Sequence, residues 1–211
     1  MKKIGLISCG LEPNYGACLQ AFATQNIVER LGYNIDIISY SFMNECEYSP
    51  FSQNNFKSFA TCCLFYELRR GIHFAFQKFR DKYMKYSDSV IKSKDDFRKI
   101  INDYDCFLIG SDQVWNPFLG IDTDITLLKF YDNGPRKISY ASSFGVSHLP
   151  DDKKEYYREA FKSFDCISVR EPTGKTIINE LTDKKVEVVL DPTLLMNADD
   201  WEGYAESVDI N

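Results

Sequence analysis

The sequence has few histidines and no cysteine pair of the kind that holds a metal ion or a redox centre. Its two histidines, His73 and His148, are far apart in the chain, so we predict that it builds no metal site. The seven cysteines are odd in number and contain no C-x-x-C pair, which argues against a disulfide framework. Cys9, Cys106 and Cys166 lie in apolar runs and are predicted to be reduced core thiols.

Long apolar segments are also lacking. The longest apolar run, residues 59–66, is far shorter than the roughly 20 residues that cross a bilayer. The N-terminal run MKKIGLISCG is too short for a secretory signal and is typical of a first strand. We therefore expect a soluble, cytoplasmic protein.

An excess of basic residues is absent as well. The 211 residues include 31 acidic and 25 basic side chains, for a formal net charge of −6, which is the wrong sign for nonspecific binding to nucleic acid. Residues 1–100 carry 14 basic and 10 acidic side chains, whereas residues 101–211 carry 11 and 21, so the charge is polarised. With 44% hydrophobic residues, the chain is long enough to bury the core of one large domain.

Apolar strands and amphipathic helices alternate along most of the chain. Residues 3–9 and 34–40 are predicted strands, joined by a helix that has Asn14 as its candidate N-cap and ends before Gly32. The apolar stripe of this helix is predicted to be Leu19, Phe22, Ala23, Ile27 and Leu31. Further elements are predicted at 94–102 (helix), 104–109 and 137–142 (strands), 151–163 (helix), 166–169 (strand), 173–181 (helix) and 186–190 (strand).

This alternation predicts the α/β fold class, with a Rossmann-like parallel sheet and helices on both faces. Residues 41–99 interrupt it and are predicted to form a largely helical, basic and aromatic insertion. Such a composition suits peripheral contact with a membrane surface, but a helix that packs on a sheet has the same composition.

Ligands of open parallel sheets bind outside the carboxyl ends of the strands, so the residues that follow each strand are the candidate site. The candidates for substrate binding are Gly10, Asn14, Tyr15, Gly16, Ser111, Gln113, Trp115, Ser142, Ser143 and Asp191, and the candidates for catalysis are Asp112 and Arg170. The first loop fits neither a dinucleotide nor a P-loop motif. It is either an anion or sugar site at a helix N-terminus or a plain tight turn.

Each of the other candidates also has a structural interpretation. Asp112 either contacts substrate or orders its own loop. Trp115 either stacks on a sugar or fills the core. Asp191 either binds substrate or starts a turn that has Pro192 at its second position. Arg170 ends a buried strand and must therefore meet an anionic ligand or an acid. Glu171, Asp191 and Asp112 are the available acids.

Five sequence blocks occur here in the order typical of one protein family. They are NYG at 14–16, GSDQVWN at 110–116, KISYASSFG at 137–145, ISVRE at 167–171 and VLDPTLL at 189–195. On these blocks the chain closely resembles the polysaccharide pyruvyl transferase family over nearly its whole length. Ala17 departs from the family, which often has Asp or Asn after the NYG-type turn.

The resemblance implies a two-domain GT-B-type transferase. Such enzymes move the enolpyruvyl unit of phosphoenolpyruvate, a donor substrate and not a cofactor, onto hydroxyls of a sugar or lipid-linked glycan as a ketal. Residues 1–195 would be the N-terminal, acceptor-side domain, and residues 196–211 would begin a linker to a second domain that is absent. Arg170 would bind the donor's anionic groups and Asp112 would position the acceptor; the oligomeric state is left open.

Two other functions are compatible with the same pattern. A nucleotide-sugar glycosyltransferase would share the architecture but use another donor. A noncatalytic domain would retain the fold and bind a glycan or a protein partner.

Overall fold

The computed structural model describes residues 2–9, 14–40 and 66–205; for residues 66–69 it describes the backbone alone. The strands are β1 (Lys3–Ile7), β2 (Asn34–Tyr40), β3 (Tyr86–Ile91), β4 (Cys106–Ile109), β5 (Arg136–Ser139), β6 (Ile167–Val169) and β7 (Val186–Val188). The α-helices are α1 (Tyr15–Arg30), α3 (Tyr66–Tyr83), α4 (Lys94–Ile100), α5 (Thr123–Thr126), α6 (Asp151–Lys162), α7 (Pro172–Asn179) and α8 (Ala198–Glu202). Two 3₁₀ helices, η4 (Ile101–Asp103) and η5 (Pro192–Leu195), also lie within the described residues.

Five strands form one parallel sheet in the order β3-β2-β1-β4-β5. Strands β6 and β7 pair in parallel as a second sheet, and isolated bridges from Ile138 to Cys166 and from Ser142 to Val169 connect it to the β5 side. The predicted parallel α/β architecture is confirmed. Because the strand order reverses between β1 and β4, the topology opens a crevice at their carboxyl ends, where ligands of doubly wound sheets bind.

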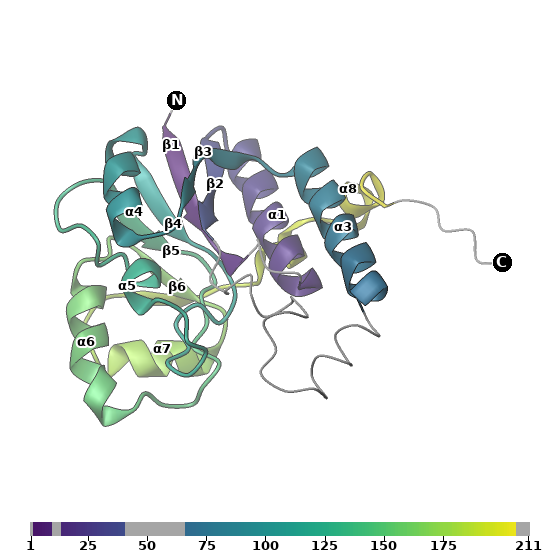
Figure 1. Cartoon of the computed structure of the whole chain (residues 1–211). Coiled ribbons are helices and arrows are strands. Elements are labelled where there is room, and N and C mark those ends of the chain that lie inside the picture. Colours follow the sequence, from purple (N-terminus) through teal and green to yellow (C-terminus); the bar gives the residue numbers. More distant parts are fainter. Residues whose placement is uncertain (1, 10–13, 41–65, 206–211) are drawn as a thin grey trace, which may run out of the picture.

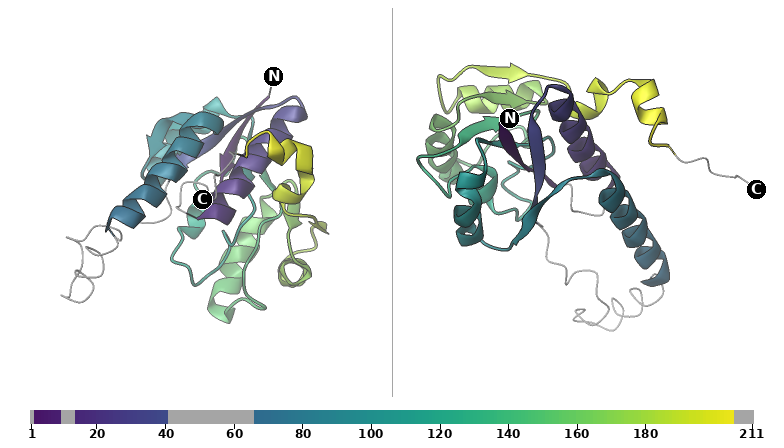
Figure 2. Two further views of the ribbon diagram at one scale, coloured as in Figure 1. Left: turned by 90° about the vertical axis from the view of Figure 1, so that its right-hand side faces the viewer. Right: turned by 90° about the horizontal axis from the view of Figure 1, so that it is seen from above.

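Helices cover both faces of the sheet. Helices α1 and α3 lie on one side and α4 and α6 on the other (Figures 1 and 2). The strand residues alternate accordingly, since Leu6 belongs to the core beneath α1 whereas its neighbour Ile7 belongs to the core on the other face. Both faces are therefore buried, as expected of a parallel sheet.

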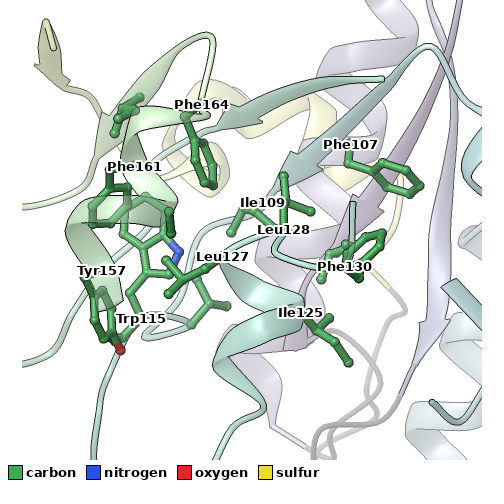
Figure 3. Packing of buried hydrophobic residues seen from close by; sticks show 14 of the residues in the cluster. Phe107, Ile109, Trp115, Ile125, Leu127, Leu128, Phe130, Tyr157, Phe161 and Phe164 are labelled. Atoms are coloured by element: carbon green, nitrogen blue, oxygen red, sulfur yellow. Dashed lines mark hydrogen bonds between the residues drawn. The ribbon is translucent and has the colours of Figure 1, made fainter. Parts of the chain in front are cut away.

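The core on the α4 and α6 side is rich in aromatic rings. Trp115 is fully buried, and its ring packs against Phe161 with a centroid distance of 4.9 Å (Figure 3). Its indole Nε1 donates a hydrogen bond to the Thr126 carbonyl at 2.9 Å. Trp115 thus fills the core, and its burial contradicts the alternative of a sugar-stacking surface.

Helix α1 buries Phe22 and Ala23 as predicted, and Ile27 packs against the same core, but the outer members of the predicted stripe are not buried. Leu19 and Leu31 are exposed, at 37% and 69%, whereas Gln20 and Gln25 are buried. Helix α1 is in contact with both α3 and the segment 196–205, so polar residues beside its apolar stripe are also enclosed. Gly32 has the predicted left-handed conformation at the end of the helix, with φ of +85°.

The region predicted as a helical insertion contains a strand. The region forms the helix α3, as predicted, but it also forms β3, which pairs with β2 as an edge strand of the main sheet. Residues 41–65 of the predicted insertion lie outside the described residues. Phe76 of α3 is buried, while Phe74 is 69% exposed. Among the described helices, none is both long and apolar enough to cross a bilayer, and peripheral membrane contact stays a prediction.

The thiols follow the prediction in part. Cys9 and Cys106 are buried, but Cys166 is exposed because it precedes β6 at the margin of the sheet, so its placement in the core was wrong.

Residues 196–205 contact α1. The Arg30 guanidinium binds the Asp200 carboxylate through both terminal nitrogens, at 2.8 and 2.7 Å. Phe22 of α1 contacts the rings of Trp201 and Tyr204 at centroid distances of 5.9 and 4.7 Å. The predicted domain boundary at residue 195 stays a prediction.

Phe22→Ala tests this packing. The Phe22 side chain lies between α3 and the segment 196–205 and is only 1% exposed. Its truncation should lower the free energy of unfolding by about 3–5 kcal/mol. Denaturant unfolding followed by circular dichroism measures the change. Leu31→Ala, at an exposed position of the same helix region, is the control and should change stability by less than about 0.5 kcal/mol. Equal effects of the two substitutions would contradict the packing.

Candidate functional site

A cleft of about 260 Å³ opens at the carboxyl ends of the strands. Its walls come from the start of α1, the turn after β4, and the residues that follow β6 and β7. The lining residues are Asn14, Gly16, Ala17, Gln20, Asp112, Arg170, Asp191 and Thr193. The structure therefore brings together five predicted site residues, Asn14, Gly16, Asp112, Arg170 and Asp191, from four separate parts of the chain.

Asn14 caps α1. Its Oδ1 accepts a hydrogen bond from the Ala17 backbone N–H at 3.0 Å, which confirms the predicted N-cap. Tyr15, also predicted to bind substrate, is 72% exposed, and its ring packs on Phe76 at 4.9 Å. Gly10 lies outside the described residues.

Asp112 occupies an unusual backbone conformation. Its φ is +114°, a region that favours glycine and costs other residues about 1–3 kcal/mol. Its carbonyl accepts a hydrogen bond from the Ser143 N–H at 2.9 Å, which fixes the turn against the chain after β5. Its Oδ1 accepts from the Gln113 N–H at 2.7 Å. One carboxylate oxygen thus orders the loop, while Oδ2 makes no hydrogen bond to any described residue.

The Asp191 carboxylate connects three strand ends. Its Oδ1 accepts hydrogen bonds from the backbone N–H and the hydroxyl of Thr193, at 3.0 and 2.7 Å. Its Oδ2 accepts from the Ser111 hydroxyl at 2.6 Å and from Arg170 Nη1 at 3.2 Å. Four donors occupy this carboxylate, so Asp191 and the fully buried Ser111 support Arg170 instead of offering free groups to a ligand.

Arg170 lies in the cleft, and two of its three guanidinium nitrogens each donate to a different carboxylate. Nε donates to Glu171 at 2.8 Å and Nη1 to Asp191 at 3.2 Å and to Ser111 at 3.3 Å. Among the described residues, Nη2 has no hydrogen-bond acceptor. Burial opposes the charge, but the bonds to Glu171 and Asp191 outweigh it and raise the pKa of Arg170. The guanidinium is therefore charged and fixed in direction, with one nitrogen left for a ligand.

The surroundings of Asp191 also favour its charged form. Burial alone would raise the pKa of this carboxyl, but the hydrogen bonds from Ser111, Thr193 and Arg170 outweigh burial and lower it.

A second cleft of about 300 Å³ adjoins the N-terminus of α7. Gln113 and Ser143, both predicted to bind substrate, line this second cleft and not the first. Gln113 Oε1 accepts a hydrogen bond from Asn116, and Ser143 Oγ accepts from the Gly145 N–H at 3.1 Å. The remaining candidate, Ser142, is fully buried and donates to the Gly110 carbonyl at 3.0 Å, so its role is structural.

Three residues that line the cleft were not among the predicted site residues: Ala17, Gln20 and Thr193. Thr193 follows the DP turn and binds Asp191, a contact that the DPT sequence itself suggests. Gln20 lies in the second turn of α1 and is only 3% exposed. Nothing in the local sequence distinguishes it from a solvated helix residue.

A parallel doubly wound sheet with a polar cleft at its switch point is the class of α/β protein that binds small ligands at strand ends. The family model for polysaccharide pyruvyl transferase matches residues 14–211. The chain therefore belongs to the polysaccharide pyruvyl transferase family. Comparison with curated proteins and with solved structures gave no match.

Asp191→Asn tests the support of Arg170. The carboxylate, whose folded-state pKa lies below its usual value, stabilises the folded protein above about pH 4, and this stabilisation is lost as the pH falls through the folded-state pKa. The variant should lose about 1–3 kcal/mol of unfolding free energy at neutral pH and show a shallower decline of stability below about pH 4. Urea unfolding at a series of pH values measures both effects.

Asp183→Asn, at an exposed position, is the matched control and should change neither quantity. Equal stability of Asp191→Asn and the unsubstituted protein at neutral pH would show that the four hydrogen bonds do not support the site.

Proposed function

We propose that the protein binds a sugar acceptor in the Arg170 cleft and takes part in transferring the enolpyruvyl unit of phosphoenolpyruvate onto hydroxyls of a cell-surface glycan, as a ketal. The family match supports the transfer. The observation that carries the proposal is that Arg170 and Asp112, which come from different strand ends, line the same cleft, and each has one polar atom without a hydrogen-bond partner among the described residues.

The reaction sets the chemical requirements of the site. Protonation of the methylene carbon of phosphoenolpyruvate creates an oxocarbenium-like centre, and a sugar hydroxyl attacks it as that hydroxyl loses its proton. The bond to phosphate then breaks, and a second hydroxyl attacks the same carbon and closes the ketal, with its proton leaving. The site needs a group that orients and deprotonates hydroxyls, cations that neutralise the donor, and an acid that protonates the methylene carbon.

Asp112 meets the first requirement. The backbone at φ +114° fixes its carboxylate, and Oδ2 is available to accept a hydrogen bond from an acceptor hydroxyl. Arg170 contributes to the second requirement through Nη2, which Glu171 and Asp191 hold in direction. Phosphoenolpyruvate enters as a substrate, and the proposal requires no resident cofactor.

The charge of the cleft supports an acceptor-side role. Of the described residues that line it, Arg170 is the single cation, whereas Asp112 and Asp191 are acidic and Glu171 binds the same guanidinium. A phosphate and a carboxylate on one small donor need more positive charge than this arrangement provides. We therefore propose that this chain corresponds to the acceptor half of a GT-B-type enzyme and that the donor's other cations come from elsewhere.

A product assay tests the function. The protein, in the form that its gene encodes, is incubated with phosphoenolpyruvate and methyl pyranosides, phosphate is measured by colorimetry, and the sugar ketal by mass spectrometry. We expect ketal and phosphate in equal amounts. Transfer from a nucleotide-sugar instead, or phosphate release without any ketal, would contradict the proposal.

The isolated residues 1–211 should release little phosphate in the same assay. The reason is the shortage of cations around the cleft described above. Rapid phosphate release by this chain alone, dependent on the acceptor, would place a complete donor site within it.

Arg170→Lys tests the planar guanidinium. Lysine keeps the charge but has a single side-chain nitrogen, which cannot take over the bonds to Glu171 and Asp191 and also contact a ligand. Ketal formation should therefore fall by about tenfold to a thousandfold. Arg136→Lys is the control, because Arg136 is exposed and its Nε lies 3.8 Å from Asp165. An unchanged rate per folded Arg170→Lys molecule, with a lowered melting temperature, would make Arg170 purely structural.

A further inference from the structure

Helix α1 contains two glutamines that are equally buried but differently paired. Gln20 and Gln25 are each 3% exposed. Both ends of the Gln25 amide are occupied, because Nε2 donates to the Tyr83 carbonyl at 3.1 Å and Oε1 accepts from the Lys85 N–H at 2.7 Å. Gln25 therefore joins α1 to the chain between α3 and β3, and its role is structural.

The Gln20 amide is paired at one end only. Nε2 donates to the Ser8 hydroxyl, while Oε1 is buried and has no hydrogen-bond partner in the described part of the chain. A buried acceptor without a partner is costly, so such an atom in a native protein needs an explanation. The other atom of this kind among the described residues, Thr126 Oγ1, belongs to a buried residue whose carbonyl binds Trp115 in the core. Gln20, in contrast, lines the cleft.

The rest of the cleft shows what kind of group is missing. Asp112 Oδ2 is a second acceptor without a described partner, while the positive charge of Arg170 is already balanced by Glu171 and Asp191. Two oxygen acceptors cannot donate hydrogen bonds to an anion, and they fit instead a ligand group that presents hydroxyl donors. A neutral sugar has such donors on neighbouring carbons.

We infer that Gln20 is a positioning residue for the acceptor, with Oε1 accepting a hydrogen bond from one hydroxyl of a neutral sugar while Asp112 accepts from another. The identification of this sugar as the acceptor rests on the proposed function. Gln20 would then select which pair of hydroxyls is presented for ketal formation, and Ser8 would fix the direction of the amide.

Binding is measured directly, without turnover. The full 211-residue chain, labelled with ¹⁵N, is titrated with the methyl pyranosides of galactose, glucose, mannose and N-acetylglucosamine, and separately with inorganic phosphate. The expected result is a saturable shift of the Gln20 side-chain amide signal with at least one pyranoside and none with phosphate. No shift of this signal with any of the four sugars, or a larger shift with phosphate, would overturn the inference.

Three variants separate recognition from stability. Gln20→Met removes the acceptor at similar volume and should weaken pyranoside binding about tenfold or more. Gln20→Glu keeps an oxygen acceptor and should bind within about threefold of the unsubstituted chain. Gln25→Met, the matched control on the same helix, should lower the melting temperature but leave sugar binding unchanged.

Two outcomes with these variants would overturn the inference. Equal loss of binding in Gln20→Met and Gln20→Glu would show that the acceptor oxygen is not the recognised group. Unchanged binding in folded Gln20→Met would make Gln20 structural. Sugar binding through Gln20 without any ketal formed in the product assay would instead refute the proposed function alone.

Discussion

The Asp191 carboxylate is the interaction on which the arrangement of the cleft depends. It receives hydrogen bonds from Ser111 after β4, from Arg170 after β6 and from Thr193 after β7, so three strand ends share one half-buried anion. A half-buried carboxylate loses part of its hydration, and here the hydrogen bonds outweigh that cost. The same bonds determine where the Arg170 guanidinium points, and with it the charge that a ligand meets.

The strand order places this cluster beside the start of α1. Because the order reverses between β1 and β4, the turn that carries Asp112 and the helix that carries Gln20 open onto the same crevice. One wall is thus a rigid helix capped by Asn14, and the other is a turn whose backbone is held in an unfavourable conformation. A site with both walls fixed before the ligand arrives loses little conformational entropy on binding.

Much of the fold could be predicted from the sequence, because buried parallel strands are continuous apolar runs and the helices between them are regularly spaced. Strand β3 was missed because it is an edge strand with three consecutive exposed residues, which reads as a polar loop. For the site, the need of Arg170 for a partner was predictable from its strand end, but only the geometry selects Glu171 and Asp191 over Asp112. Gln20 was not predictable, since its burial and its unpaired oxygen arise from tertiary contacts.

The packing of residues 196–205 on α1 also has a consequence for folding. Arg30 and Asp200 are 170 positions apart, and Asn26 and Tyr204 are 178 apart, yet each pair is joined by hydrogen bonds. Contacts between such distant positions form late, because the entropy of closing so long a loop must be overcome first. During synthesis, rings of α3 can pack on Phe22 well before Trp201 and Tyr204 are made, so only the side of Phe22 that these two later rings cover stays open until the segment 196–205 has left the ribosome.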